Sequence, residues 1–380
     1  MEKETEKKRV LQISNYYFPE LGGIEKIAQA ISKAVEGQYE EKIICFTHDK
    51  QDKTEYIGST ELIRCGTKAV VDSQQLSFSM KKKMKGLMES YDPDIVIIHL
   101  PNPFTTHLTL KYISDRAKLI VYWHSDIVKQ VLGERLFRNM VFKLLDRADR
   151  IIATSPNYID DSIYLSKYKN KCTVIPNCIE ENNLNIDDET QSVIERIKTE
   201  NTDKIICVGV GRQVPYKGFE YVIRAIKELD DRFELYLVGR KGESTSEMER
   251  LSSGMDNVHL IGEADHKTLK AYLASCDIFC FPSITKNEAF GIALAEGMYF
   301  GKPAVTFTIH GSGVNYVSIA DETGLEVSNA DVKGYADALR KLADDPDMRH
   351  RLGDNAGRRV RDLFLSEHFG ERFRELLAEL

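Results

Sequence analysis

The segment Ser283–Pro303, SITKNEAFGIALAEGMYFGKP, is the stretch that decides the fold. An apolar run at Asp277–Phe281 precedes it, and a helix is expected to follow Gly291. Two acids, Glu288 and Glu296, lie before this helix and inside it, with seven residues between them. Because the first turn of a helix has unpaired N–H groups and partial positive charge, it binds anions. The pattern predicts a strand, a phosphate-binding loop and a helix, with acids placed for sugar hydroxyls; two solvated surface acids are the alternative.

The composition is that of an ordinary globular protein of two or three domains. The chain has 380 residues, of which 42% are hydrophobic and 29% are charged. No apolar run approaches the roughly 18 residues of a membrane span, and the charged segment Met1–Arg9 predicts no secretory signal. The seven cysteines are odd in number and scattered, which favours buried free thiols in a reducing compartment. Cys276 and Cys280 lack a second Cys/His pair, so a zinc site is not expected.

Charge is distributed unevenly along the chain. Residues 1–180 carry 27 Lys and Arg against 24 Asp and Glu, whereas residues 181–380 carry 25 against 35. This asymmetry suggests that the more basic half meets an anionic surface.

Strand-like and helix-like segments alternate through both halves of the sequence. The expected strands are 10–14, 42–46, 61–65, 95–99, 119–123, 151–154 and 173–175 in the first half, and 204–209, 233–238, 258–261, 277–281 and 303–306 in the second. Such alternation predicts an α/β protein with two doubly wound, Rossmann-like domains facing a central cleft. We place the N-terminal domain at residues 1–180 and the C-terminal domain at 181–363, with a helix near 364–380 packing back on the first domain.

Two features of the N-terminal half are candidates for a ligand site. Gly22 and Gly23 lie where the first strand hands over to the first helix, which is where nucleotide-binding α/β folds approach a ligand, although a plain turn explains them equally well. His124 follows a strand and is expected at the ligand crevice; a structurally satisfied histidine is the alternative.

A cationic loop follows the first strand of the C-terminal half. Arg212 and Lys217 flank it, and its edge of the sheet is the one expected to hold the turn at Gly291. A guanidinium and an ammonium group are suited to a diphosphate. Two solvated loop cations are the alternative, and the acid pair at the same edge argues against it.

One predicted helix, Leu76–Tyr91, is both basic and apolar. Its four clustered cations are Lys81, Lys82, Lys83 and Lys85. Methionines recur beside them at helical spacing, and a second basic and apolar stretch runs from Lys129 to Arg150. The pattern suggests contact with an anionic membrane surface; core methionines with solvated lysines are the alternative.

These motifs together resemble the retaining GT-B glycosyltransferases of family 4. The matching segments are Arg212-x4-Lys217-Gly218, 257–262, 277–282, Glu288-x7-Glu296 with Phe290-Gly291, and 301–303, joined in the N-terminal half by Gly22-Gly23, His124 and Asn177. The sequences at 311–313 and 323–325 look like the branch that builds bacterial surface polysaccharides, including mannosyltransferases. Ala289, where Gly is commoner, and Cys178-Ile179-Glu180 after Asn177 depart from the pattern.

The resemblance implies a role for each candidate residue. Arg212 and Lys217 would hold the diphosphate of a nucleotide-sugar, helped by the backbone near Phe290, Gly291 and Ile292. Glu296 would bind the ribose, Glu288 and His124 the donor sugar, and Gly23 would let the first loop approach the phosphate. His124 and Glu288 would be the catalytic pair.

The implied activity is transfer of a hexose, mannose first, from a nucleotide-sugar to a glycan or lipid-linked glycan, with retention of configuration and without a metal or other cofactor. GDP-mannose is the first donor and a UDP-hexose the second, with GDP or UDP as product. No nucleic acid partner is expected, and the enzyme would be cytoplasmic, peripheral on the inner face of the membrane. A GT-B nucleotide-sugar epimerase, a phosphorylase, for which no distinctive pyridoxal lysine is visible, and a non-catalytic nucleotide-sugar binding protein are the alternatives.

Overall fold

The computed structural model describes residues 7–20, 22–71, 74–126 and 134–380. The chain forms two compact units. One contains the N-terminal residues up to Asn177 together with Glu367–Leu380, and the other is Cys178–Ser366. The sequence boundaries were placed at 180/181 and near 364, so the observed divisions lie three residues away at each crossing.

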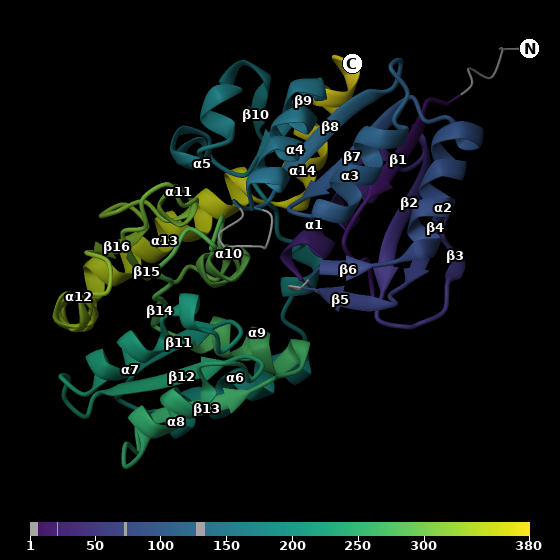
Figure 1. Cartoon of the computed structure of the whole chain (residues 1–380). Coiled ribbons are helices and arrows are strands. Elements are labelled where there is room, and N and C mark those ends of the chain that lie inside the picture. The colour runs from purple at the N-terminus through teal and green to yellow at the C-terminus, as the bar shows by residue number, and fades with distance from the viewer. Residues whose placement is uncertain (1–6, 21, 72–73, 127–133) are drawn as a thin grey trace, which may run out of the picture. The chain divides into compact units, whose positions relative to one another are not determined.

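The N-terminal unit is built on an eight-stranded sheet with the order β10-β9-β8-β7-β1-β2-β4-β3, in which β3 alone is antiparallel to its neighbour (Figure 1). Its strands are β1 Arg9–Ile13, β2 Glu40–Thr47, β3 Lys53–Ile57, β4 Thr60–Gly66, β7 Ile95–Leu100, β8 Lys118–Trp123, β9 Arg150–Ala153 and β10 Cys172–Val174. A separate hairpin pairs β5 Ala69–Val71 with β6 Gln74–Leu76. Strand order reverses between β1 and β7, so the loops after these strands flank the switch point of the sheet.

Among the described residues of this unit, five α-helices connect the strands: α1 Gly23–Val35, α2 Phe78–Gly86, α3 Pro103–Tyr112, α4 Glu134–Arg147 and α5 Pro156–Asp161. A π-helical turn at Leu87–Tyr91 extends α2, so the helix predicted over 76–91 is present from Phe78 onward, whereas Leu76 ends β6. The sequence pattern did not predict β3 or the β5–β6 hairpin. The residues of β3 are mostly exposed and show no apolar alternation, and β5 and β6 are three residues each, too short to show a period.

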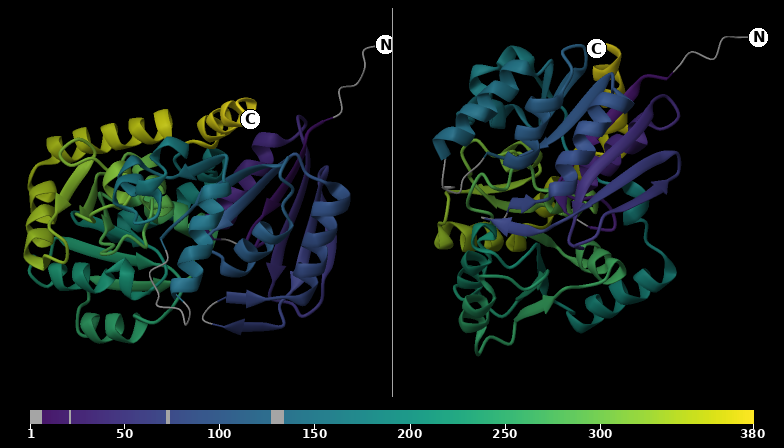
Figure 2. Two further views of the ribbon diagram at one scale, coloured as in Figure 1. Left: turned by 45° about the horizontal axis from the view of Figure 1, so that its top comes forward. Right: turned by 45° about the vertical axis from the view of Figure 1, so that its right-hand side comes forward.

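The last helix, α14 Ser366–Ala378, belongs to the N-terminal unit from Glu367 onward. It is drawn in yellow in Figures 1 and 2. Phe369 and Phe373 are buried, and Gly370 faces Ala34 of α1. The chain enters α14 through Phe364–Ser366, which hydrogen-bonds with Ile179 as a short parallel bridge.

The second unit is a wholly parallel six-stranded sheet with the order β13-β12-β11-β14-β15-β16. Its strands are β11 Ile205–Val210, β12 Phe233–Val238, β13 Val258–Gly262, β14 Ile278–Phe281, β15 Ala304–Phe307 and β16 Gly324–Val327. Every predicted strand of this half is present within two residues of its expected bounds. The strand order reverses between β11 and β14, and these two strands are paired.

Helices cover both faces of the second sheet. They are α6 Asp188–Glu200, α7 Phe219–Ile226, α8 Thr245–Ser252, α9 His266–Ser275, α10 Ile292–Tyr299, α11 Val314–Val317, α12 Val332–Asp344 and α13 Pro346–Leu363. One apolar cluster joins α7, α8 and α12 to one face, and a second joins α6, α9 and α10 to the other. Alternation along β14 produces this division, because Cys280 enters the first cluster while Phe279 and Phe281 enter the second.

Candidate active site

The loops after β11 and β14 meet at the switch point of the second sheet. Gly218 ends the first loop with φ +64°, and a Cβ there would lie 2.1 Å from the carbonyl oxygen of Pro282. The Ile284 N–H donates to the carbonyl oxygen of Tyr216 at 3.0 Å. These contacts bring the backbones of the two loops into direct contact. Open α/β sheets bind ligands at this position.

Lys217 and Glu288 form an ion pair between these loops. The Lys217 ammonium donates to Glu288 Oε2, and the two side chains are 11% and 12% exposed. The ammonium also lies 5.0 Å from the centre of the Phe281 ring. Burial acts to lower the pKa of Lys217, but the Glu288 carboxylate outweighs it, and the pKa of Lys217 is raised above its usual value. Lys217 is therefore a fixed positive charge at neutral pH.

The loop that carries Glu288 is held by the segment after β15. The Ser312 hydroxyl donates to the carbonyl oxygen of Glu288, and the Gly313 N–H donates to that of Ala289 at 3.0 Å. A Cβ at Gly313 would lie 2.3 Å from the Ala289 carbonyl oxygen. Ser283 adds a hydrogen bond of 3.4 Å to Glu288 Oε2. The acid is thus positioned from three directions.

Helix α10 begins beside this acid. Gly291 is the N-cap residue with φ +93°, a conformation that favours glycine, and no side chain caps the helix. Its first N–H groups have no intrahelical acceptors, so they can bind an anion. Glu296 lies in the second turn and is half-buried.

Two predicted donor-binding residues near this turn have core side chains. Phe290 is buried and packs edge-on against Phe364 with ring centres 5.4 Å apart, and Ile292 packs at the border of the same cluster. Their side chains are apolar and are more stable in the core than in solvent, which fixes the backbone at the start of α10. Their backbone groups remain available for the predicted role.

Arg212 differs from Lys217 in being exposed. Within the described part of the chain its guanidinium makes no ion pair or hydrogen bond. Its backbone carbonyl accepts from the Val214 N–H at 2.8 Å, so the backbone of the residue is fixed while the side chain extends into solvent. An exposed guanidinium on an ordered loop keeps its donors available for an anion.

In the N-terminal unit, His124 follows β8 and is buried. Its Nε2 lies 2.7 Å from Nδ1 of His99, whose Nε2 lies 2.8 Å from Oε1 of Gln12. Tyr122 stacks on the His124 ring, with ring centres 4.5 Å apart, and its hydroxyl donates to Oδ1 of Asn177. Burial lowers the pKa of His99 to about 3 and that of His124 well below the usual value, so both rings are neutral at pH 7.

The hydrogen bonds of Gln12 assign the tautomers of both histidines. The Gln12 amide nitrogen donates to the carbonyl oxygen of Ala28 at 3.2 Å and to Glu41 Oε1 at 3.0 Å. Its oxygen therefore accepts from His99 Nε2–H, which leaves His99 Nδ1 as the acceptor of His124 Nε2–H. The remaining nitrogen of His124, Nδ1, carries a lone pair and can accept a hydrogen bond from a hydroxyl group.

Gly22 and Gly23 stand at the start of α1, where Gly22 is the N-cap residue. A Cβ at Gly22 would lie 2.2 Å from Oε2 of Glu25, whose carboxyl group is buried beside the first turn. Burial raises the pKa of Glu25. The glycine pair thus makes room for an acid at this helix terminus, and the predicted role of Gly23 toward phosphate stays a prediction.

Sequence reasoning did not find Gln12, His99, Ser283 or Ser312 as supporting residues. His99 closes an apolar strand, and its parallel neighbour leads to His124, so a polar residue in a buried strand was the available signal. The residues that the structure describes include no cluster of three or more potential metal ligands. No helix in the described ranges is long and apolar enough to cross a membrane.

The comparisons with known proteins agree with this architecture. A family model described as Glycosyltransferase Family 4 matches residues 21–183, and one described as Glycosyl transferases group 1 matches residues 190–359. Among solved structures, a sucrose-phosphate synthase from Thermosynechococcus elongatus aligns with a TM-score of 0.79 and 19% identity over 98% of this chain and 99% of that chain. HepE from Anabaena in complex with UDP aligns with a TM-score of 0.76 and 16% identity over 98% and 100%.

Two Rossmann-like units of this kind define the GT-B class of glycosyltransferases, as predicted. Two relatives match almost end to end. The O-antigen chain mannosyltransferase C of Escherichia coli is 29% identical over 98% of each chain. The D-rhamnosyltransferase WbpZ of Pseudomonas aeruginosa is 30% identical over 94% of this chain and 92% of its own. The chain belongs to glycosyltransferase family 4, which confirms the resemblance seen in the sequence.

Proposed function

We propose that this protein transfers a hexose from a nucleotide-sugar to a glycan or lipid-linked glycan in polysaccharide biosynthesis. The observation that carries the proposal is the buried Lys217–Glu288 pair, which lies between the loops at the switch point and ahead of the α10 N-terminus. Mannose is the sugar that we favour, because a mannosyltransferase is 29% identical over 98% of the chain. GDP-mannose is the first donor and a UDP-hexose the second.

The ion pair suggests how the donor is handled. Without a donor, Lys217 and Glu288 neutralise each other. A diphosphate would give Lys217 and Arg212 an anionic partner, and the Glu288 carboxylate would then be available to sugar hydroxyls. The α10 N–H groups would stabilise the charge that develops on the leaving nucleotide, as preorganised donors do. Glu296 would bind the ribose of the nucleotide.

We further propose that transfer retains the anomeric configuration, by a front-face route through an oxocarbenium-like state. Glu288 is paired with a lysine and not with a second acid. This arrangement differs from the pair of carboxyl groups, one nucleophile and one acid, that retaining hydrolases use. His124 would accept a hydrogen bond from a hydroxyl of the sugar through Nδ1. Cations take the role of a metal in this scheme, so activity is expected to persist in excess EDTA.

Membrane docking is the second part of the proposal, and one expectation behind it is corrected. Met80 and Met84 are fully buried, so the apolar stripe of α2 belongs to the protein core. Lys81, Lys82 and Lys85 are exposed, Lys83 lies 3.3 Å from Asp52, and Phe78 is 85% exposed at the start of the helix. We propose that these lysines and Phe78 contact an anionic membrane reversibly. Of the second basic stretch, Lys129–Arg150, residues 129–133 lie outside the described residues, and Glu134–Arg147 forms α4.

The test begins with a thermal-shift screen of nucleotide-sugars, since a ligand at a hundred times its Kd adds about 2.7 kcal/mol of stability. The donor that binds is then incubated with and without oligomannoside or lipid-linked glycan acceptors. Free nucleotide should appear only with an acceptor, and also in EDTA. A new nucleotide-sugar formed without acceptor would indicate an epimerase, and binding without turnover would indicate a binding protein. Strict dependence on added Mg²⁺ or Mn²⁺ would refute only the scheme in which Arg212 and Lys217 take the role of a metal, and it would leave the proposed transfer reaction in place.

A further inference from the structure

Polar side chains form a continuous row across the sheet of the N-terminal unit. Five neighbouring strands contribute one side chain each, in the order β8, β7, β1, β2 and β4. In the same order, the members of this polar row are His124, which directly follows β8, His99, Gln12, Glu41 and Thr60. The first four are at most 7% exposed. Buried polar groups cost free energy unless they are paired, and the proposed transfer reaction uses only His124.

Every hydrogen bond of the polar row donates in the direction of Glu41. His124 Nε2–H donates to His99 Nδ1 at 2.7 Å, and His99 Nε2–H donates to Gln12 Oε1 at 2.8 Å. The Gln12 amide nitrogen donates to Glu41 Oε1 at 3.0 Å, and the Thr60 hydroxyl donates to Glu41 Oε2 at 3.1 Å from the other side. Aligned hydrogen bonds strengthen one another, because each bond polarises the next.

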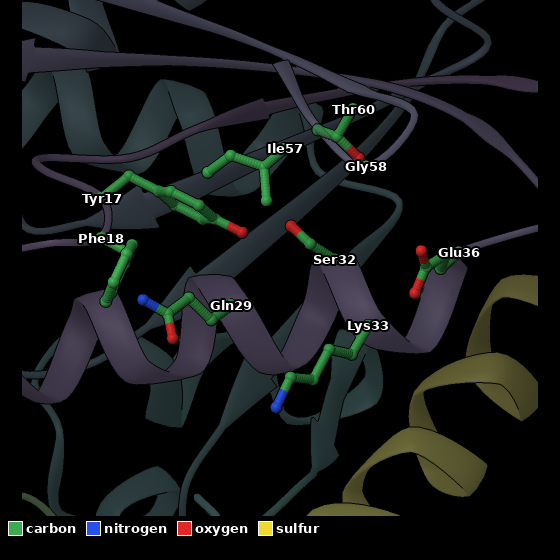
Figure 3. A pocket seen from close by; sticks show the side chains of 9 residues that line it. All are labelled: Tyr17, Phe18, Gln29, Ser32, Lys33, Glu36, Ile57, Gly58 and Thr60. Carbon is green, nitrogen blue, oxygen red and sulfur yellow. The ribbon is translucent and has the colours of Figure 1, made fainter. Parts of the chain in front are cut away.

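Gln12 sets this direction, because its amide group is held in one orientation. The amide nitrogen lies 3.2 Å from the carbonyl oxygen of Ala28 and 3.1 Å from the hydroxyl of Ser32, both on α1. A reversed amide would place its oxygen against the Ala28 carbonyl oxygen, which has no hydrogen to donate. Ser32 projects from α1 toward the strands (Figure 3), and its hydroxyl and that of Thr60 contact the two carboxyl oxygens of Glu41.

The two imidazole rings are held in their planes by stacking. The ring centre of Tyr122 lies 5.5 Å from that of His99 and 4.5 Å from that of His124. The Tyr122 hydroxyl is bonded in turn to Asn177 at 3.1 Å. At the end of the row, Nδ1 of His124 carries a lone pair, and it is not among the enclosed unpartnered atoms of the described residues. The row therefore ends in an acceptor that a ligand can reach.

We propose that Gln12 and His99 are positioning residues of the transfer reaction. They act through His124, whose proton they keep on Nε2, so that the sugar meets a lone pair at Nδ1 and not an N–H group. The inference rests on the proposed function, in which the sugar gains positive charge as its bond to the nucleotide breaks. A hydroxyl of that sugar then becomes a stronger donor, which a lone pair stabilises and an N–H group opposes.

Nitrogen-15 NMR on the full chain, labelled at its histidines, measures the tautomers without substrate. A ring nitrogen that carries a proton and one that carries a lone pair give separate signals. His124→Asn identifies the signals of His124 among those of the nine histidines. Steady-state kinetics of transfer on the same proteins gives kcat and the donor KM.

Four variants separate polarity from packing. Gln12→Met removes the acceptor of the His99 proton, and His99→Phe interrupts the row with a ring. His99→Gln keeps the polarity, because its amide has an oxygen for His124 and an N–H group for Gln12. Thr109→Val is the matched control: Thr109 is buried in α3 of the same unit, and its hydroxyl has no hydrogen-bond partner in the structure.

The wild type, Thr109→Val and His99→Gln should carry the His124 proton on Nε2, whereas Gln12→Met and His99→Phe should lose this preference. The latter two should lower kcat roughly 3- to 10-fold, the effect of one hydrogen bond, with the donor KM close to that of the wild type. Thr109→Val should leave both unchanged, and His99→Gln should retain most of kcat.

Three results would overturn the proposal: a proton on Nδ1 of His124 in the wild type, an unchanged tautomer or kcat in Gln12→Met, or a loss of kcat in His99→Gln as large as in His99→Phe. A wrong tautomer in the wild type leaves the proposed transfer reaction in place. Absence of transfer by the wild type would instead refute the proposed function, and the NMR spectra would still report the tautomer.

Discussion

At the scale of single residues, Lys217 and Arg212 belong to the same loop but differ in their exposure and contacts. Lys217 is 11% exposed and bonded to Glu288, whereas Arg212 is exposed and extends into solvent. A charge-assisted contact to phosphate contributes about 1.5–3 kcal/mol. We therefore expect Lys217→Ala and Arg212→Ala each to lower kcat/KM by roughly 10- to 150-fold.

Steady-state kinetics at low donor concentration checks this expectation. Lys227→Ala, which removes an exposed lysine at the end of α7, is the matched control and should be close to wild type. Circular dichroism should show that each variant is folded. Near-normal turnover in both the Lys217 and the Arg212 variant would reject the diphosphate assignment.

The two acids of the motif should separate in their kinetic effects. Glu288 precedes the α10 N-terminus and is held by Ser312 through its backbone, while Glu296 lies inside the helix. Contacts that strengthen in the transition state act on kcat, and uniform binding contacts act on KM. Glu288→Gln should lower kcat more than it raises the donor KM, and Glu296→Gln should do the reverse. The opposite order would contradict the division of roles.

Because the Glu41 carboxyl group is buried, we expect the free energy of unfolding to depend on pH, independently of catalysis. Burial raises the pKa of Glu41 from 4.5 to about 7, against the hydrogen bonds from Ser32, Thr60 and Gln12, which lower it. Because the folded state favours the protonated acid, its contribution is fully present below pH 4.5 and is lost as pH rises toward 7. The loss is on the order of 3 kcal/mol, because each pH unit between 4.5 and 7 contributes up to about 1.4 kcal/mol.

Urea unfolding between pH 4.5 and 8 tests this effect. The free energy of unfolding of the wild type, measured relative to Glu41→Gln, should fall across the window, because the amide cannot ionise. A difference between the two proteins that is constant with pH would show that Glu41 is ionised in the folded state throughout.

At the scale of elements, α2 shows most clearly where the expectation from the sequence pattern differs from the structure. Its methionines and lysines form one amphipathic sequence, and the structure buries Met80, Met84 and Met88 while leaving most of the lysines in solvent. Periodicity identifies the apolar stripe of a helix, but whether protein or lipid covers that stripe depends on the rest of the fold. Any lipid contact by α2 must therefore be mainly electrostatic.

Liposome co-sedimentation tests that contact. Binding should require anionic lipid and decrease as salt rises, because screening weakens charge–lipid attraction. Changing Lys81, Lys82 and Lys85 to Ser, with Lys83 kept for Asp52, should abolish it. The same charge change at Lys227, Lys333 and Lys341 of the other unit is the control. Equal recovery with neutral and anionic vesicles would exclude α2 as the membrane contact.

At the scale of the whole molecule, the chain crosses between its units twice, and α14 returns to stabilise the first one. Phe373 of α14 is fully buried, and a buried Phe→Ala change costs about 3–5 kcal/mol. Trp123 is the single tryptophan of the sequence and is buried in the N-terminal unit, so its fluorescence reports that unit. Phe373→Ala should lower the urea midpoint seen by Trp123 clearly more than Phe307→Ala in the second unit. Equal shifts would contradict an assignment of α14 to the N-terminal unit.

The amino-acid sequence by itself determined the two α/β halves, the strands with buried apolar runs, and the loops that carry Arg212, Lys217 and Glu288, but it did not predict β3, β5, β6 or β16. These features follow from local patterns. The periods of strands and helices, and the residues at strand ends, involve only residues that are close together in the sequence. Family motifs are also local sequence patterns, so the motifs and the comparisons identify the same class of glycosyltransferase.

Only the tertiary structure decided which polar residues meet. His99 and His124 are brought together by the pairing of β7 with β8, and Gln12 reaches them because β1 pairs with β7. The burial of Phe290 and the ion pair between Lys217 and Glu288 likewise depend on contacts between segments far apart in sequence. Such contacts are set by packing and strand order, which no local period encodes.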